Sequence, residues 1–332
     1  MNPIRVGSGS FQYHVDQSWA RFPAAGDSGE AVGVACDSKD RVYVLLRGPR
    51  PVQVFERDGT PVAAWGEGVF VRPHGIWVGP DDTVYCTDDF GHTVRAFSSD
   101  GTPRLTLGTP GKPSDTGATS VDYRTIKRAG PPFNYPTNLA VGPKGDLYVA
   151  DGYGNARIHR FAGDGRLQRS WGEPGGGPGQ FHVPHGIAVD QTGTVYVADR
   201  ENSRIQLFDA AGGYLGEWTD VARPCQLYID RAGWIYVAEL GFRAGRWPGT
   251  GTHQPGQTGG RVSIFDRQGS LHARWGGGDH PCDPGDFFAP HDIWADSRGD
   301  VYVAEVTLSA GGRAGIVPGS CHTFQKFVRQ SE

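Results

Sequence analysis

The segment Thr194-Val195-Tyr196-Val197 decides the fold, because close copies of it recur along the chain. Valine, isoleucine and tyrosine between glycine and aspartate turns are typical of a β-strand. The copies read Arg41-Val42-Tyr43-Val44, Thr83-Val84-Tyr85-Cys86, Asp146-Leu147-Tyr148-Val149, Thr194-Val195-Tyr196-Val197, Trp234-Ile235-Tyr236-Val237 and Asp300-Val301-Tyr302-Val303. A strand repeated at this period indicates one supersecondary unit that is stacked several times.

Each copy lies within a unit of four predicted strands. A third strand follows most copies, such as Arg157-Ile158-His159-Arg160-Phe161, and a fourth ends in Trp-Gly at Trp65, Trp171 and Trp275. Four short strands per repeat are typical of a propeller blade. We therefore predict an all-β protein, a six-bladed β-propeller with four antiparallel strands in each blade. The predicted blades are approximately 30–66, 70–108, 133–172, 181–219, 223–275 and 288–328.

The last repeat, around Phe324-Gln325-Lys326-Phe327, is short of an outer strand. We expect residues 8–20 to supply it, because closure of the ring would remove a free sheet edge. The length of 332 residues alone would suggest two domains. The repeat favours a single propeller domain over residues 1–332 instead.

Composition limits the classes of partner. The 51 glycines and 24 prolines fit many tight turns, and 32 basic against 36 acidic residues leave no basic patch. We therefore expect no nucleic-acid partner. An apolar run of membrane-spanning length is missing, and none follows Arg5 as in a signal peptide, so we expect no membrane partner. The five cysteines lack Cys-x-x-Cys spacing, Cys36 and Cys86 fall in predicted strands as buried hydrophobes, and we expect a reduced cytoplasm.

Three histidines occupy the same position in alternate repeats. At this position the six predicted blades carry Val32, His74, Thr137, His185, Cys225 and His291. Alternate blades of a six-membered ring lie about a third of a turn apart, so the three imidazoles would converge. Three neutral imidazoles with an open fourth position suit a catalytic zinc ion, and Fe, Co, Ni or Mn are alternatives. The other interpretation is that the histidines hydrogen-bond backbone carbonyls and cap the channel, and Cys225 is read as a wall residue.

The end of the second strand returns to the face that carries the histidines. The residues there are Arg47, Tyr153 and Arg200. Two guanidiniums beside a phenol would favour the phenolate, a base usable near neutral pH, and would also pair with a substrate carboxylate. The alternatives are a half-buried strand-end tyrosine and arginines paired with Asp or Glu of neighbouring blades. Recurring acids at this end suggest structural caps: Asp151, Asp199, Glu239 and Glu305.

Three long inserts are also expected at the histidine face, where functional loops gather on a scaffold. They are residues 109–132, 241–260 and 306–322. Lids over the site and an interface between chains are both open interpretations of these inserts.

The stretch from Phe181-His182-Val183-Pro184-His185-Gly186-Ile187 to Ala198-Asp199-Arg200-Glu201-Asn202-Ser203-Arg204-Ile205-Gln206 closely resembles peptidyl-α-hydroxyglycine α-amidating lyase, of the NHL-repeat propellers. The resemblance recurs around Pro73-His74-Gly75, Gly152-Tyr153-Gly154, Pro290-His291-Asp292 and Arg47-Gly48, and it extends over all six repeats. Generic NHL repeats lack the alternating histidines, so this likeness is more specific than the fold alone.

The resemblance implies a zinc ion held by three histidines, which match His74, His185 and His291. It also implies a catalytic tyrosine that matches Tyr153 and active-site arginines that match Arg47 and Arg200. A structural calcium ion would bind at positions that match Val34, Ile76 and Asp292. The implied reaction cleaves the carbon–nitrogen bond of an N-acyl-α-hydroxyglycine to an amide and glyoxylate.

This chain also departs from the family. The matching places for the disulfides of the secreted animal enzyme carry Gly154, Tyr196 and Leu207, and the copper monooxygenase domain is missing. The substrate is therefore open to other small carbinolamides. We expect a metal-dependent carbon–nitrogen lyase that acts on a small molecule or peptide of this kind. The alternatives are a propeller hydrolase such as a lactonase, and a non-catalytic NHL platform that binds protein.

Overall fold

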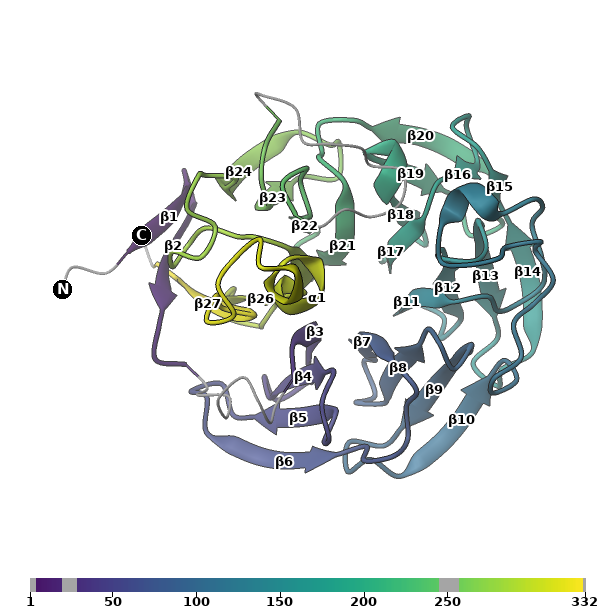
Figure 1. Cartoon of the computed structure of the whole chain (residues 1–332), viewed down its shortest axis with the longest axis horizontal. Helices are drawn as coiled ribbons and strands as arrows, with labels where there is room; N and C mark the ends of the chain where they lie inside the picture. The colour runs from purple at the N-terminus through teal and green to yellow at the C-terminus, as the bar shows by residue number, and fades with distance from the viewer. Residues whose placement is uncertain (1–3, 20–28, 245–256, 331–332) are drawn as a thin grey trace. The chain divides into compact units, whose positions relative to one another are not determined.

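The computed structural model describes residues 4–19, 29–244 and 257–330, which fold mainly into β-strands (Figure 1). They form a six-bladed β-propeller of antiparallel blades, as predicted. The described chain falls into two compact units of three blades each. One unit holds residues 68–224, and the other holds residues 4–19, 29–67, 225–244 and 257–330.

The unit of residues 68–224 contains three four-stranded sheets. Their strands are β7 (Pro73–Val78), β8 (Val84–Asp88), β9 (Thr93–Phe97) and β10 (Pro103–Leu107); β11 (Pro136–Val141), β12 (Leu147–Asp151), β13 (Arg157–Phe161) and β14 (Leu167–Trp171); and β17 (Pro184–Val189), β18 (Val195–Asp199), β19 (Arg204–Phe208) and β20 (Tyr214–Trp218). Short elements between them are η1 (Tyr123–Thr125), the parallel pair β15 (Glu173–Pro174) and β16 (Gln180–Phe181), and η2 (Arg200–Asn202). Within this unit β11 contacts both β7 and β17.

The other unit also contains three sheets. Their strands are β3 (Ala31–Cys36), β4 (Val42–Leu46), β5 (Val52–Phe55) and β6 (Pro61–Trp65); β21 (Pro224–Ile229), β22 (Ile235–Glu239), β23 (Arg261–Phe265) and β24 (Leu271–Gly276); and β25 (Pro290–Ala295), β26 (Val301–Glu305), β27 (Phe324–Arg329), β2 (Phe11–Asp16) and β1 (Arg5–Ser8). The last sheet takes its outer strand from the N-terminal segment, since β2 pairs with β27. Strand β1 adds a fifth strand that the repeat does not contain. The insert after β26 carries α1 (Thr307–Ala310) and η3 (Gly312–Ala314).

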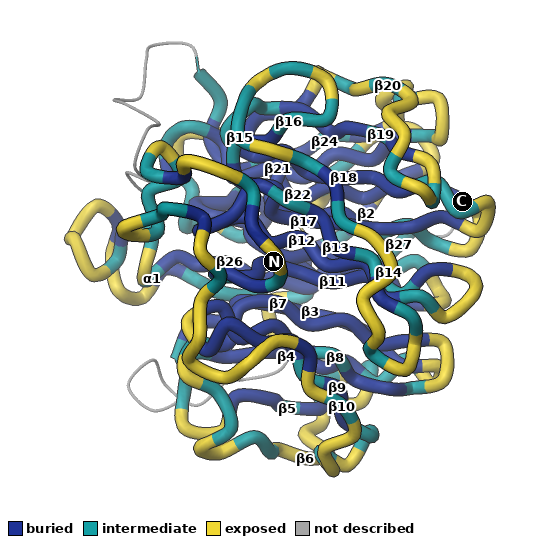
Figure 2. The backbone as a smooth tube through the Cα atoms, turned by 90° about the vertical axis from the view of Figure 1, so that its right-hand side faces the viewer, coloured by how far each residue is buried: buried dark blue, intermediate teal, exposed yellow. Residues whose placement is uncertain are grey.

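The core lies along the first two strands of each blade, and the first strands β3, β7, β17 and β25 are buried throughout. Every residue of β12, β18 and β26 is buried, whereas the outer strands β6 and β20 are largely exposed (Figure 2). The Val-Tyr-Val segments are therefore apolar on both strand faces because the two faces are both covered. Full burial of one such side chain contributes about 1.5–3 kcal/mol.

Short turns join the first two strands of a blade. In the turn after β17, the Asp190 carboxylate accepts hydrogen bonds from the N–H groups of Thr192 (2.8 Å) and Thr194 (3.0 Å). Gly193 follows at φ +89°, a conformation that glycine adopts without steric cost. Within the described residues, no helix is long and apolar enough to cross a membrane.

Candidate metal centre and its surroundings

The three histidines lie at irregularities in the first strand of their blades. The strand register shifts across each histidine, between Pro73 and Gly75, between Pro184 and Gly186, and between Pro290 and Asp292. Such a β-bulge turns one side chain out of the regular ladder. The preceding proline is tolerated because the first residue of a strand needs no ladder donor. The same shift occurs at Val32 and Thr137 in two other blades, so the bulge belongs to the repeat, and three blades place an imidazole at it.

Backbone carbonyls fix the orientation of two of these rings. Nδ1 of His74 lies 2.7 Å from the carbonyl oxygen of Thr137, and Nδ1 of His291 lies 2.7 Å from that of Val32. Since a carbonyl only accepts, both Nδ1 atoms carry the proton and donate it. The lone pair of each ring is then on Nε2, which is the arrangement found in metal-ligating histidines. The carbonyl-capping interpretation thus describes one nitrogen of each ring, and the other nitrogen, Nε2, carries the lone pair.

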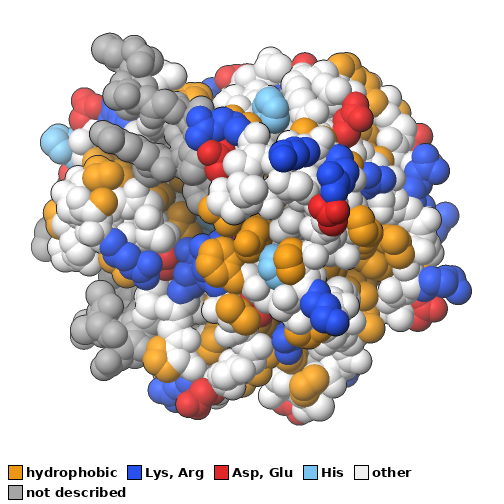
Figure 3. Space-filling view, turned by 45° about the vertical axis from the view of Figure 1, so that its right-hand side comes forward, with side chains coloured by type: hydrophobic (Ala, Val, Ile, Leu, Met, Phe, Trp, Pro, Cys, Tyr) orange, Lys and Arg blue, Asp and Glu red, His pale blue; other side chains and the backbone are white. Residues whose placement is uncertain are grey.

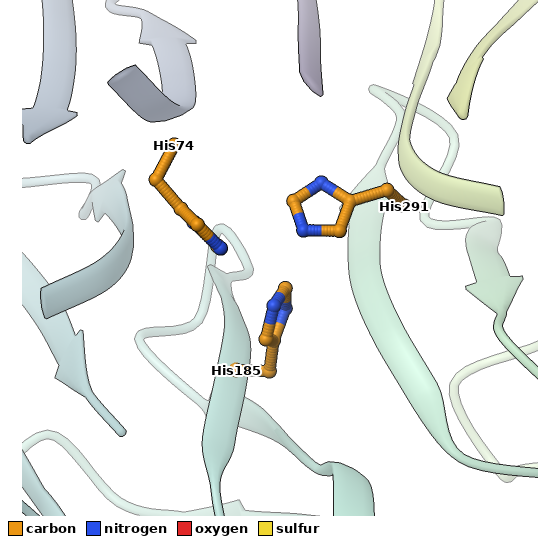
Figure 4. Close-up of side chains that lie close together, drawn as sticks. All are labelled: His74, His185 and His291. Carbon is orange, nitrogen blue, oxygen red and sulfur yellow. The ribbon is translucent and has the colours of Figure 1, made fainter. Parts of the chain in front are cut away.

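The three imidazoles form a candidate metal site. One ring nitrogen of each of His74, His185 and His291 lies within 4.8 Å of those of the other two, and all three residues are buried. Figure 4 draws the three side chains, and within the unit of residues 68–224 the ring centroids of His74 and His185 lie 4.9 Å apart. Three neutral nitrogen donors suit zinc and other divalent transition metals. The residues present therefore fit such an ion.

Tyr153 contacts two of the histidines. Its hydroxyl lies 2.9 Å from Nε2 of His74 and 2.9 Å from Nε2 of His185. The Tyr153 ring meets both imidazoles edge to face and is itself buried. Nη1 of Arg200 approaches the same hydroxyl at 3.4 Å. The structure thus brings a phenol, a guanidinium and two imidazoles together within the unit of residues 68–224.

A carboxylate that the sequence did not single out holds Arg200. Oε1 of Glu201 accepts from Nε of Arg200 at 2.8 Å and from Nη2 of Arg223 at 3.0 Å. The three side chains are almost fully buried. Although burial alone would raise the pKa of Glu201, the two guanidiniums lower it below its usual value. Glu201 is therefore ionised at neutral pH.

Buried carboxylates at the ends of the second strands hold the loops that lead to the histidines. Asp88 accepts from the N–H groups of Val71 and Arg72, both at 2.9 Å. Asp199 accepts from the N–H group of His182 at 2.8 Å, and Glu305 from that of Phe288 at 3.0 Å. Of the recurring acids of the sequence, Asp151, Asp199 and Glu305 therefore cap loops, Asp151 by accepting from the N–H group of Asn134, whereas Glu239 accepts from the Arg261 side chain. Burial raises the pKa of Asp199 to about 6, although Asn202 and Arg204 oppose the shift.

Arg47 has a different environment from Arg200. Its Nη1 donates to the buried Glu30 carboxylate at 2.9 Å and to Oγ of Ser309 at 3.2 Å. Ser309 belongs to α1 in the 306–322 insert, and its N–H group also donates to Glu30 at 2.8 Å. Arg47 is thus ion-paired to a carboxylate of its own blade. The catalytic role implied for Arg47 stays a prediction.

Asp292 and Val34, two of the expected calcium ligands, lie together. Oδ2 of Asp292 accepts from the N–H group of Val34 at 3.3 Å, and Oδ1 accepts from that of Ile293 at 2.8 Å. Complete burial raises the pKa of Asp292 well above its usual value. A buried carboxylate of this kind fits a hard cation, which would offset the desolvation. Ile76, the third expected ligand, belongs to the other unit.

The cysteines depart in part from the expectation. Cys36, Cys86 and Cys225 are free and buried, as the strand pattern predicts for the first two, and burial raises the thiol pKa of Cys36 and Cys86. Cys282 and Cys321, however, form a disulfide bond, which the sequence pattern did not indicate. Disulfides are characteristic of oxidising compartments, so this pair does not fit the expected reduced cytoplasm.

The inserts are described in part. The 109–132 insert contains η1, and the 306–322 insert contains α1 and η3. Of the 241–260 insert, residues 245–256 lie outside the described residues.

In the face shown in Figure 3, acidic and basic side chains are interspersed.

Comparison with known proteins finds one repeat family and relatives of two kinds. A family model for the NHL repeat matches residues 133–161 and 181–208, which contain three strands of each of two neighbouring blades. Human NHL repeat-containing protein 3 is 37% identical over 221 residues, covering 63% of this chain and 60% of the human protein. Peptidyl-α-hydroxyglycine α-amidating lyase 1 of Drosophila melanogaster is 35% identical over 161 residues, covering 45% of this chain and 27% of that protein.

The chain thus matches less than two thirds of the length of these relatives. A gluconolactonase structure from Xanthomonas campestris aligns with 99% of this chain and 96% of its own at a TM-score of 0.62 and 15% identity, a likeness of fold alone. Residues 133–161 and 181–208 of this propeller match the NHL repeat, and the chain is similar to NHL repeat-containing protein 3. It is homologous to peptidyl-α-hydroxyglycine α-amidating lyases.

Proposed function

We propose that this protein is a metal-dependent carbon–nitrogen lyase that cleaves an N-acyl-α-hydroxyglycine, or a similar small carbinolamide, to an amide and glyoxylate. One observation carries the proposal. The Tyr153 hydroxyl lies between Nε2 of His74 and Nε2 of His185, at 2.9 Å from each, with the Arg200 guanidinium beside it. The site therefore offers a base next to ligands for a metal ion.

The residues of the chain account for the movement of protons. Tyr153 as phenolate takes the proton of the substrate hydroxyl, and the oxygen electron pair forms the carbonyl bond of glyoxylate. The electron pair of the broken carbon–nitrogen bond stays on the amide nitrogen, which takes the proton from the Tyr153 phenol, so that the neutral amide forms and the phenolate is restored. The reaction is an elimination, so it needs no oxidant or reductant. A base placed within hydrogen-bonding distance typically contributes about 10²–10⁴ in rate.

Arg200 has two roles in this proposal. Its positive charge at 3.4 Å from the Tyr153 hydroxyl favours the phenolate form of the base. Its planar fork also suits the carboxylate of an α-hydroxyglycine. Arg47 is proposed to act on the substrate in a similar way from its pair with Glu30.

The proposed ligands of the metal ion are His74, His185 and His291. Zinc is the first choice for three neutral nitrogen donors, and other divalent transition metals share this preference. When bound, the ion supplies a positive charge that polarises the substrate hydroxyl. The Nδ1 bonds of His74 and His291 keep both rings in the tautomer that such an ion requires.

A second, structural ion is proposed at Asp292. Calcium would take the Asp292 carboxylate and the backbone carbonyls of Val34 and Ile76, since hard cations favour oxygen ligands. The fully buried carboxylate of Asp292 supports this proposal. A fall in the melting temperature on chelation of calcium, restored by added calcium, is the expected result, and an unchanged melting temperature would remove the role.

The reaction is tested with α-hydroxyhippurate, the N-benzoyl form of the substrate. We expect the zinc-loaded protein to release glyoxylate and benzamide in equal amounts, and the chelated protein to release neither above the uncatalysed rate. Glyoxylate is measured as its phenylhydrazone. Zinc-loaded protein without turnover of this or other carbinolamides would reject the lyase. A site that binds metal but hydrolyses a lactone would favour the hydrolase, and protein that binds no transition metal would favour a binding platform.

A further inference from the structure

We propose that Glu201 and Arg223 are positioning residues that hold the Arg200 guanidinium as a subsite for a substrate carboxylate. This inference rests on the proposed function for the identity of the substrate. The three side chains form a buried ion triad beside Tyr153, in the unit of residues 68–224. The resemblance to the lyase family implies a role for Arg200, and it implies none for Glu201 or Arg223.

Glu201 determines which edge of the Arg200 guanidinium is used. Its Oε1 occupies Nε of Arg200 at 2.8 Å, and Nη1 of the same guanidinium points to the Tyr153 hydroxyl at 3.4 Å. The guanidinium is planar, so a fixed Nε edge also fixes the direction of the Nη edge. A lysine at this position would be a point charge without such an orientation.

Arg223 in turn holds Glu201. Nε of Arg223 donates to Oε2 at 3.2 Å, and Nη2 donates to Oε1 at 3.0 Å, a two-pronged contact that uses both carboxylate oxygens. Arg223 is 1% exposed, which makes it one of the largest fully buried side chains. The triad contains two positive charges and one negative charge. It therefore keeps a net positive charge for a carboxylate, and the contribution of Glu201 is the direction of the Arg200 fork and not the charge itself.

The backbone places the triad with unusual conformations. Arg223 has φ +51° and Ser203 has φ +49°, and the N–H group of Arg223 donates to Oγ of Ser203 at 3.3 Å. The N–H group of Arg200 donates to the carbonyl of Val183. Val183 itself has φ +60°. A positive φ is costly for residues other than glycine and persists where the surroundings impose it. Such positions cluster at functional sites, which supports a role beyond packing.

The 109–132 insert covers the same region. The ring of Tyr123, in η1, lies 4.9 Å from the ring of His182, which directly follows β16 (Figure 1). The His182 carbonyl accepts the N–H group of Glu201 at 3.0 Å. The insert thus packs against the segment that carries the triad and limits its contact with water. Ion pairs that are shielded from water are screened less by salt and keep a fixed geometry.

The test uses hippurate, which has the carboxylate and lacks the reactive hydroxyl. Its affinity for the zinc-loaded protein is measured by titration calorimetry, so the result does not depend on turnover. We expect Glu201→Gln and Arg223→Gln to weaken hippurate binding at least tenfold. Glu201→Asp and Arg223→Lys keep the charges but lose the paired geometry, and we expect an intermediate loss. These two variants keep the test decisive if the neutral variants do not fold.

A matched control is Arg261→Gln, which breaks a comparable ion pair with the buried Glu239 (2.8 Å) in another blade. It should lower the melting temperature without changing hippurate affinity. Turnover gives a second readout. For α-hydroxyhippurate, Glu201→Gln should raise KM at least tenfold with a smaller change in kcat. For N-(hydroxymethyl)benzamide, which lacks the carboxylate, Glu201→Gln should change KM much less than it does for α-hydroxyhippurate, while any effect through the Tyr153 base should lower kcat for both substrates alike.

The outcomes separate this inference from the proposed function. Equal hippurate affinity in the wild type, Glu201→Gln and Arg223→Gln would overturn the positioning role, and so would a wild type that does not bind hippurate. Losses of the same size for both substrates would also overturn it, because they indicate general damage. Hippurate binding that depends on Glu201, without glyoxylate release from any carbinolamide, would keep the subsite and reject the lyase.

Discussion

The two ends of the blade β7–β10 are held by aspartates in different ways. At the histidine end, Asp88 is fully buried and accepts N–H groups of Val71 and Arg72, which lie 17 and 16 residues away in the sequence. At the opposite end, Asp100 is exposed and accepts from Oγ of Ser98 (2.6 Å) and the N–H group of Thr102 (3.0 Å), both two residues away. One end depends on the folded blade, and the other is a local turn.

This difference shows which end of the blade holds its loop in a fixed position through the folded sheet. A local turn forms from its own residues, as Asp and Ser side chains do in many turns. The loop before His74 is instead fixed by a carboxylate from the second strand, so its position follows from the packing of the sheet. We therefore expect substitutions at the histidine end to affect both chemistry and stability. Matched substitutions at the turn end should affect neither strongly.

The largest expected difference concerns two buried tyrosines of the same unit. Tyr153 lies at the histidine end, and the Tyr196 hydroxyl donates to Asp190 at 3.3 Å at the turn end. Tyr153→Phe should lower kcat for α-hydroxyhippurate by about 10²–10⁴, the usual contribution of a positioned base. Tyr196→Phe should leave kcat within about twofold, which is about 0.4 kcal/mol in barrier height. Both variants should retain the wild-type metal content. Full activity of Tyr153→Phe would move the base to another group.

A smaller difference is expected between the two aspartates. Asp88→Asn places an amide group where three backbone N–H donors, including that of Gly91 at 3.0 Å, require an acceptor. We expect a loss of about 1–3 kcal/mol in the free energy of unfolding, as for other hydrogen bonds to charged groups. Asp100→Asn should leave the urea midpoint close to that of the wild type. Equal midpoints for the two variants would mean that the buried carboxylate does not hold the loop.

The smallest expected effect depends on pH. His322, in the insert after β26, lies 2.9 Å from Glu305. Burial lowers the pKa of His322, but the Glu305 carboxylate raises it more, so the net shift is upward. A raised pKa of the folded state contributes stability below the unfolded value of about 6.5 and loses it as the pH rises through the higher folded value.

Asp100, at the turn end, titrates in a lower pH range than His322, and its stabilising contribution is lost as the pH falls. Hydrogen bonds from Ser98 and Thr102 lower the pKa of Asp100 to about 2. Its contribution is present above the unfolded value of about 3.9 and is lost as the pH falls toward 2.

Because the contribution of His322 is lost as the pH rises, the melting temperature should decrease above neutrality in the wild type and stay level in His322→Gln. The same slope in both proteins would contradict the assignment to His322.

The parts of the molecule that could be predicted are those that produce a local or repeated pattern in the sequence. The Val-Tyr-Val segments identified the second strands, and the Pro-His pairs marked His74, His185 and His291, which the structure groups as residues that could hold a metal ion. Strand connectivity placed Tyr153 and Arg200 on the same face, and the structure brings them together. The positions of these residues could be predicted because repetition turns a position in the sequence into a position in the fold, and their roles stay predictions.

Long-range contacts of single residues could not be predicted in this way. The carbonyls of Thr137 and Val32 that orient the histidines are backbone groups, which no residue type signals. Arg223 reaches Glu201 across 22 residues, and its only signal was its place before a proline at the start of a strand, as for Arg72. The Cys282–Cys321 bond joins two loops that belong to no repeated pattern.

Metal analysis of the purified protein tests the central claim most directly. The wild type, dialysed against zinc and then against metal-free buffer, should retain about one zinc ion per chain, held by three imidazoles at about 2.0–2.1 Å. His185→Ala should keep the circular dichroism spectrum of the wild type and retain almost no zinc. A wild type that releases all zinc, or a folded His185→Ala variant that keeps a full equivalent, would contradict the account.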